Sequence, residues 1–318
     1  MRKGAIITAV ILIAAGLLIA VGGLAAGGSF KPMEFETKTY PVSEPVTGIC
    51  LKTQITDVQL MPSPDGTTYV SAAETDGIRH TVTVQNGTLT IETVDERSRI
   101  DRILPLPDLQ MIVYLPATSY RELSAVCRTG CLEIAKEFTF ESVDINCSTG
   151  DVRCGASASG RMKIETSTGD IRLDNVKAED LWLIVSTGRI EIGKAEIQKG
   201  VLITVTTGRL EIDGLSCESL TSKGSTGRVT LRDTEIEHAL WIERSTGDVR
   251  LENVGAETVA VHTSTGNVTG TLQSDLYFVT ETSTGKVSVP ETHGSGRCEI
   301  KTSTGDIQIA IAGANVSE

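Results

Sequence analysis

The stretch ETSTGDIRL, residues 165–173, recurs with small changes through the second half of the chain. ERSTGDVRL stands at residues 243–251, ETSTGKVSV at 281–289 and KTSTGDIQI at 301–309. In each copy a threonine precedes a glycine, and this pair recurs every 19 or 20 residues. The glycines are Gly130, Gly150, Gly169, Gly188, Gly208, Gly227, Gly247, Gly266, Gly285 and Gly305. A fixed period of this size indicates a repeat architecture, and we expect each copy to stack on the copy before it.

Aliphatic residues alternate with polar ones on both sides of the glycine, and the phase of the alternation changes at the glycine. Around Gly169, Met162 and Ile164 precede it at odd distances, whereas Ile171 and Leu173 follow it at even distances. Period two indicates β-strands with one buried face. The glycine is therefore a structural turn, since glycine tolerates positive φ. We predict an all-β fold, a parallel β-solenoid (β-helix) of about ten coils over residues 123–318. The period is too short for propeller blades.

The residues before the repeats also read as strands. HTVTVQNGTLTIETV, residues 80–94, places Asn86 and Gly87 between two alternating runs, which is a strong hairpin signal. We predict that residues 33–122 form an N-terminal β domain that caps the solenoid, because a bare sheet edge invites aggregation.

The N-terminus predicts a membrane segment. Arg2 and Lys3 precede a stretch without charges that continues to Phe30 and is long enough for a transmembrane helix. We expect residues 1–30 to be a single-pass anchor in the cell membrane, with the bulk of the chain extracytoplasmic. A signal peptide cleaved near Ala25 and Ala26 is the alternative.

Charge and cysteine content restrict the function further. The net charge of −12 disfavours a nucleic-acid partner on electrostatic grounds, and we expect none. The seven cysteines form no CxxC pair, so a zinc site is disfavoured. Cys127 and Cys147 both stand three residues before their glycine, either as a disulfide between coils or as two small packed side chains.

The repeated triplet does not predict catalysis. A nucleophile is singular and needs a base, whereas this triplet recurs along the whole repeat and the four histidines are scattered. Gly-Asp corners are typical of calcium-binding β-rolls. Here Arg189, Arg209 and Arg228 follow three consecutive corner glycines and would repel the ion, which leaves at best a local site near Asp151 and Asp170. We expect no catalytic residue, no metal and no cofactor.

One outward position breaks the polar pattern of the surface. Six residues before the glycine stand both tryptophans of the chain, three copies apart, together with other large apolar residues. The predicted partner-binding residues are Trp182, Ile184, Leu202, Trp241, Tyr277 and Val279. An exposed apolar patch of this kind suits a protein, membrane or glycan surface. The alternative is that connecting segments or a second copy cover it.

The serial STGD(I/V) copies, preceded by a strand that ends in LP at residues 115–116, resemble the bacterial DUF4097 β-strand-repeat family over roughly residues 46–310. The resemblance implies a β-solenoid on a membrane or cell-surface protein, often described as a candidate adhesin, without established catalytic residues. We therefore expect a non-enzymatic, adhesin-like surface-binding or scaffold protein. The alternatives are an accessory or sensor component of an envelope-stress response and, more weakly, a carbohydrate-active β-helix enzyme.

Overall fold

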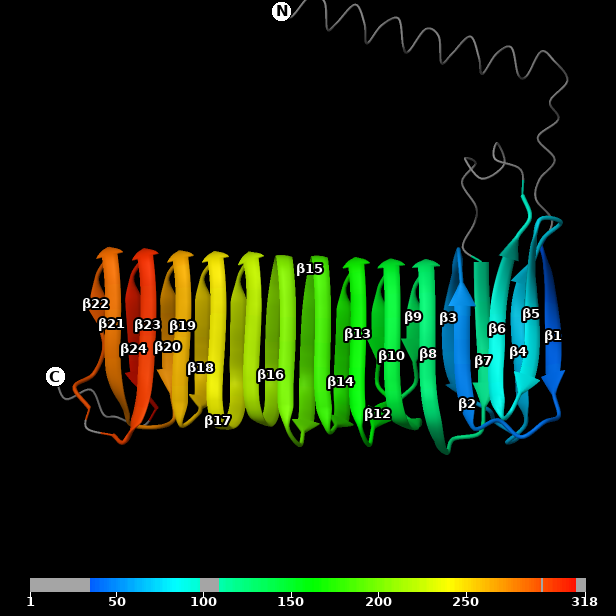
Figure 1. The fold of residues 1–318 in the computed structure, drawn as a ribbon, viewed down its shortest axis with the longest axis horizontal. Coiled ribbons are helices and arrows are strands. Elements are labelled where there is room, and N and C mark those ends of the chain that lie inside the picture. The colour runs from blue at the N-terminus through cyan, green and yellow to red at the C-terminus, as the bar shows by residue number, and fades with distance from the viewer. Residues whose placement is uncertain (1–34, 98–108, 293, 313–318) are drawn as a thin grey trace, which may run out of the picture. The chain divides into compact units, whose positions relative to one another are not determined.

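The computed structural model describes residues 35–97, 109–292 and 294–312. The chain divides into two compact units, Met1–Phe35 and Glu36–Glu318. The described part of the second unit contains strands and no helix, and it winds as a parallel β-solenoid (Figure 1). Ten corner glycines with positive φ delimit about nine turns, which confirms the predicted solenoid.

The predicted anchor at residues 1–30 lies outside the described residues. Within the part of the chain that the structure describes, no helix is long and apolar enough to cross a membrane.

The residues that precede each corner glycine build the first face of the solenoid. Its strands lie in the spatial order β5–β6–β2–β8–β10–β13–β15–β16–β17–β19–β23–β21. Their bounds are β5 Ile78–Gln85, β6 Thr88–Asp95, β2 Gly48–Thr53, β8 Ser119–Thr129, β10 Thr139–Thr149, β13 Arg161–Thr168, β15 Asp180–Ile197, β16 Gly200–Thr226, β17 Val229–Thr246, β19 Thr258–Thr265, β23 Gly296–Thr304 and β21 Leu276–Thr284, with β12 Ser157–Ala158 beside the start of β10. All neighbours pair in parallel except β5 with β6.

The residues that follow each corner glycine build the second face. Its order is β1–β4–β7–β3–β9–β11–β14–β15–β16–β17–β18–β20–β24–β22, since β15, β16 and β17 run round the corner and serve both faces. The further bounds are β1 Glu36–Val42, β4 Thr68–Glu74, β7 Leu109–Leu115, β3 Thr56–Pro62, β9 Leu132–Ile134, β11 Val152–Cys154, β14 Ile171–Ala178, β18 Val249–Gly255, β20 Val268–Leu272, β24 Ile307–Ile311 and β22 Val287–Ser288. Only the pairs β1–β4 and β4–β7 are antiparallel on this face.

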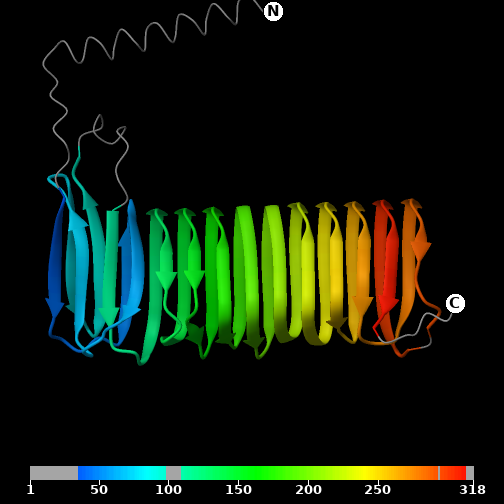
Figure 2. The same cartoon turned by 180° about the vertical axis from the view of Figure 1, so that it is seen from behind.

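Chain order and spatial order differ at both ends of the stack. β23 and β24, the last coil in the sequence, lie between the coil β19–β20 and the coil β21–β22. Figure 2 shows the red strands inside the orange ones at this end. The expectation that every copy stacks on the copy before it is therefore wrong here, because the Gly305 copy packs directly on the Gly266 copy. At the other end, β2 and β3 lie between β6–β7 and β8–β9.

The corner glycines have two reasons to be glycine. Their φ angles run from 127° at Gly130 to 159° at Gly285, in a region that side chains disfavour. The neighbouring coil also approaches closely: a Cβ on Gly208 would lie 1.6 Å from the carbonyl oxygen of Gly188. The corners therefore admit neither a side chain nor an ordinary backbone conformation.

A second column of corners, six residues after the glycine, was not expected from the sequence. Asn175, Lys194, Asp233 and Asn253 have φ of 56°, 47°, 43° and 59°, and Gly214 has φ of 82°. Short parallel segments follow these corners, as where Ala195 pairs with Val176 and with Leu215. The middle coils thus have a third short side.

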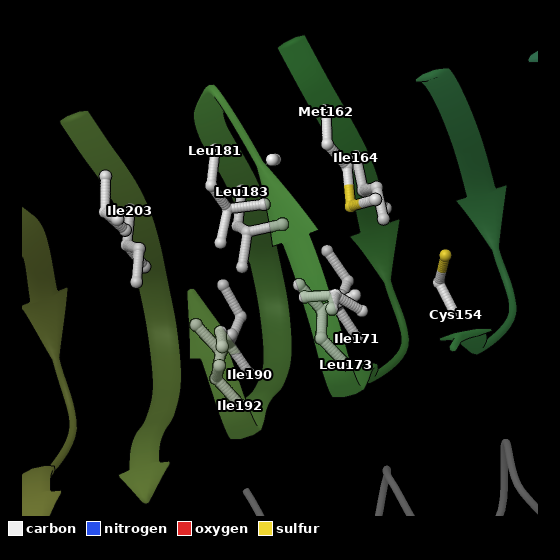
Figure 3. Packing of buried hydrophobic residues seen from close by; sticks show 14 of the residues in the cluster. Cys154, Met162, Ile164, Ile171, Leu173, Leu181, Leu183, Ile190, Ile192 and Ile203 are labelled. Carbon is white, nitrogen blue, oxygen red and sulfur yellow. The ribbon is translucent and has the colours of Figure 1, made fainter. Parts of the chain in front are cut away.

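The core consists of ladders with one residue per coil. Ile171, Ile190 and Leu210 are neighbours in register and essentially fully buried. Figure 3 shows such residues from the two faces, for example Leu183 and Ile190, packed into one interior. Burying a side chain of this size contributes about 1.5–3 kcal/mol. Since each ladder continues through the stack, stability comes from stacking rather than from any single coil.

The N-terminal end confirms the predicted hairpin and shows how the stack is closed. β5 and β6 pair antiparallel, and Asn86 and Gly87 both have positive φ. β5 covers β6 on the first face, while β4 and β1 cover β7 on the second face. The predicted boundary between residues 122 and 123 falls within β8, and the domain division stays a prediction.

Candidate functional site

The outward row of the first face places three large apolar residues within a run of four coils, in which Thr221 stands between Leu202 and Trp241. Trp182 pairs in register with Leu202, and Trp241 pairs with Thr221 of the coil before it. Leu202 and Trp241 are exposed by 36% and 39%, and Trp182 is half-buried. We call Trp182, Leu202 and Trp241 the apolar stripe. It runs along the solenoid axis for three coil spacings, about 15 Å.

Both indole rings of the stripe are held by a polar neighbour. The guanidinium carbon of Arg161 lies 4.1 Å from the ring centroid of Trp182, a cation–π contact. Trp241 meets His262 of the next coil edge-on, with ring centroids 5.0 Å apart and an interplanar angle of 69°. Neither neighbour could be assigned from the sequence, because ring contacts depend on side-chain rotamers. The two rings are therefore oriented before any partner arrives.

Small and charged residues border the stripe. On one side Ser219 pairs with Ala239, so no bulky side chain flanks Trp241 there. On the other side Ile184 lies half-buried between Glu165 and Thr204. A ligand can thus approach the protruding rings from the side of the small residues.

The structure separates Tyr277 and Val279 from the stripe. Val279 of β21 pairs with Glu299 of β23, and Glu299 in turn pairs with Ala260 of β19. Glu299 forms ion pairs with Arg297 and Lys301, so a row of charged residues lies between the stripe and the end coil. Of the six predicted partner-binding residues, Trp182, Ile184, Leu202 and Trp241 lie within four consecutive coils of the first face, and Tyr277 and Val279 belong to the end of the stack.

The aspartate of the STGD corner has a backbone role. Oδ1 of Asp151 accepts a hydrogen bond from the N–H of Asp170 (2.9 Å), and Oδ1 of Asp170 accepts one from the N–H of Arg189 (2.7 Å). The same bond joins Asp57 to Cys131, Asp248 to Asn267, Asn267 to Asp306, and Asp306 to Lys286. These oxygens fix the corner of one coil to the next, which accounts for the aspartate without a metal.

The described residues hold no group of three or more histidine, cysteine, aspartate or glutamate side chains placed to bind a metal. Asp151 and Asp170, the local calcium candidates, use their carboxylates in the corner ladder. His80 is buried beside Glu74 at the N-terminal end, whereas His238 and His262 lie on different coils beside Glu257 and Glu299.

All seven cysteines are free thiols, and they fall into three groups. Cys127 and Cys147 are buried neighbours in register, and a hydrogen bond from the Cys147 thiol lowers the pKa of Cys127 below that of an ordinary thiol. Burial raises the pKa values of Cys154, Cys217 and Cys298 to about 12. Cys50 and Cys131 are partly exposed.

This division predicts the labelling pattern of the folded chain. We expect N-ethylmaleimide to modify Cys50 and Cys131 at pH 7, and the other five cysteines only after unfolding, because reaction needs both access and thiolate. Peptide mass spectrometry before and after denaturation measures the pattern. Native labelling of Cys154 or Cys298 would show that the coils open.

A hollow of ≈ 900 Å³ at the N-terminal end contains none of the predicted site residues. It lies between Thr39–Val46, the turn around Asp65, and Tyr120. Asp65 accepts hydrogen bonds from Ser63 and Thr67, and those from Thr67 are the main reason that its pKa falls to about 2. The carboxylate thus serves its own turn, and the hollow shows no group aimed at a ligand.

Comparison with known proteins gives a family and no curated relative. A structure from Parabacteroides merdae ATCC 43184, described as a candidate adhesin, aligns with a TM-score of 0.49 at 10% identity over 87% of this chain and 96% of that chain. One from Parabacteroides distasonis ATCC 8503, described as a candidate lipid-binding protein, aligns with a TM-score of 0.45 at 12% identity over 87% and 97%. A search of curated proteins finds no match. The family model described as Toastrack DUF4097 matches residues 46–310, which includes every coil with an STG corner, and the chain therefore belongs to the Toastrack DUF4097 family.

Proposed function

We propose that this chain is a membrane-anchored, extracytoplasmic and non-enzymatic surface-binding protein of adhesin-like character, and that the apolar stripe is its binding surface. The observation that carries the proposal is the stripe itself, because Leu202 and Trp241 are large apolar side chains exposed on the outer surface of the first face. Exposed tryptophans on a rigid surface are a common basis of binding to proteins and glycans.

The scaffold supports this role by rigidity. Trp182 and Trp241 sit on the continuous strands β15 and β17, and backbone ladders fix their spacing. A ligand therefore meets preorganised rings, which reduces the entropy cost of binding. The apolar residues 4–30 after Arg2 and Lys3 support the membrane anchor.

The test is binding by the full-length chain reconstituted in lipid nanodiscs. The double variant Trp182→Ala/Trp241→Ala should bind immobilised matrix proteins or glycans at least about tenfold more weakly, as expected for the loss of central aromatic anchors. Val126→Ala is the matched control, since Val126 is also exposed on the first face but lies outside the stripe. Equal binding by the double variant and the control would remove the stripe from the function.

The envelope-stress alternative makes a different prediction in the same preparation. An accessory or sensor component should co-purify with membrane signalling proteins from its own cell. If the chain binds neither matrix proteins nor glycans but captures membrane signalling proteins, the adhesin-like proposal fails and the sensor proposal replaces it.

A further inference from the structure

The C-terminal end of the stack is an open edge. Within the described ranges, β21 pairs with β23 alone and β22 pairs with β24 alone. The outer side of β21 therefore presents unpaired backbone N–H and C=O groups beyond its first residue, Leu276, whose carbonyl accepts a hydrogen bond from the Thr292 hydroxyl. An exposed edge of this length is a template for pairing with another chain.

Among the residues that the structure describes, no strand covers the interior ladders where they end at this edge. Val287 stands at the position held by Ile307 and Val268 in the neighbouring coils, yet it is 45% exposed whereas those two are 0% exposed. Phe278 and Thr280 on the first face are half-buried, whereas their neighbours Cys298 and Ile300 in β23 are fully buried. The apolar interior of the solenoid is thus accessible at the last coil.

The opposite end is built differently. Leu89 and Ile91 in β6, and Met111 and Val113 in β7, are 0% exposed because β5 and β4 cover them. The outermost strand on the second face, β1, carries Lys38 and Pro41, and proline lacks an N–H for pairing. On the first face β5 is also an edge strand, but the ladders that it covers are closed, so the two ends do not offer matching surfaces for head-to-tail stacking.

We propose that a second copy of this chain covers the open end, with β21 antiparallel to β21 of the partner around a two-fold axis. A contact between identical ends closes at two copies. In this register Thr280 lies opposite Thr280 of the second copy. Phe278 then faces Thr282 of the second copy and Val279 faces Glu281, so residues that point into the solenoid lie opposite residues that also point inward. Glu281, the one charged residue in β21, then avoids its own copy. Backbone pairing supplies most of the contact, as in β-strand addition.

The dimer is independent of the stripe, which lies on the other side of the charged row of Glu299. Loss of ligand binding would therefore leave it intact, and loss of the dimer would leave the stripe on each copy. The full-length chain in detergent micelles, analysed by sedimentation with detergent correction, should show a protein mass of twice 33.8 kDa at tens of micromolar.

Lysine variants test which strands form the contact between the two copies. Val287→Lys and, separately, Thr280→Lys put an inward-pointing charge on the edge and should return the chain to a monomer with an unchanged circular dichroism spectrum. Thr81→Lys, on the exposed β5 edge of the other end, should remain a dimer. Thr280→Cys should form a disulfide-linked dimer on mild oxidation with diamide, beyond any background of the parent chain. A monomeric parent chain, assemblies larger than two, or loss of the dimer in Thr81→Lys would overturn the proposal.

Discussion

Replacing Gly208 with alanine is expected to destabilise the solenoid by at least about 4 kcal/mol, in the range reserved for severe disruptions. Gly208 has a φ of 149°, and its added Cβ would lie 1.6 Å from the carbonyl oxygen of Gly188. That oxygen belongs to the backbone of a coil held by ladders on both sides, so it cannot move alone. Urea denaturation of the full-length chain, followed by circular dichroism, measures the loss.

Gly193→Ala is the matched control. Gly193 lies in the neighbouring coil, five residues after Gly188, and it has no positive φ. The nearest atom to its added Cβ is a side-chain oxygen of Asp174 at 3.3 Å. It should unfold close to the parent midpoint. If Gly208→Ala unfolds together with this control, the corners tolerate side chains, and the period of 19 or 20 residues has another origin.

The fold could be predicted because the same physical requirement is repeated in every coil. A single alternation such as Met162–Ile164 is weak, but residues at that position are apolar in nearly all copies, and each copy changes phase at its glycine. The apolar stripe followed from the same phase, since Trp182 and Trp241 stand at a position that must face outward. Both inferences use backbone periodicity alone.

The order of the last two coils could not be predicted, because repeats of such similar sequence do not specify which copies lie side by side. The copies ending at Gly285 and Gly305 offer similar ladders to the Gly266 copy, and the structure places Gly305 next to it. Grouping Tyr277 and Val279 with Trp182 and Trp241 requires that the copies stack in the order of the sequence. The insertion of β23 separates them from it.

Arg244 shows a second limit of periodicity. It stands at an inward position and is buried, with Nη2 donating to Ser222 (2.8 Å) and Nη1 to the Glu243 carbonyl (2.9 Å). Gly224 of the preceding coil leaves room for the guanidinium. Burial lowers the pKa of Arg244 to about 10. The small residues Ser222 and Gly224 are the feature of the sequence that indicates room for the Arg244 side chain. They can be interpreted only once it is known that their coil packs against that of Arg244.

Glu74 gives the N-terminal end a pH-dependent stability. Its carboxylate is buried and accepts hydrogen bonds from Lys38 Nζ (2.7 Å), the Tyr40 hydroxyl and the His80 backbone N–H (2.7 Å). Burial alone would raise the pKa of Glu74, but these donors outweigh it and lower the pKa from 4.5 to about 2. A lowered carboxylate pKa stabilises the folded state above pH 4.5, and this stabilisation is lost as the pH falls through about 2.

The expected size of the effect is about 3 kcal/mol, from a shift of some two and a half pKa units. Burial also lowers the pKa of His80, so its protonation opposes folding as the pH falls below 6.5 and acts in the same direction. Hydrogen exchange of β1 and β5 in the full-length chain should therefore quicken strongly between pH 5 and pH 2, after correction for intrinsic rates.

Glu74→Gln should show fast exchange in β1 and β5 already at pH 7, because a neutral amide cannot replace the carboxylate that accepts three hydrogen bonds. Its exchange should change little further between pH 5 and pH 2, because glutamine does not titrate. Glu196→Gln is the control, since Glu196 forms an exposed ion pair with Lys177, and such pairs contribute little. Its exchange should follow the parent chain at every pH. Parent-like protection in Glu74→Gln would mean that the strands β1 and β5 close this end of the solenoid through apolar packing, without need of the buried carboxylate.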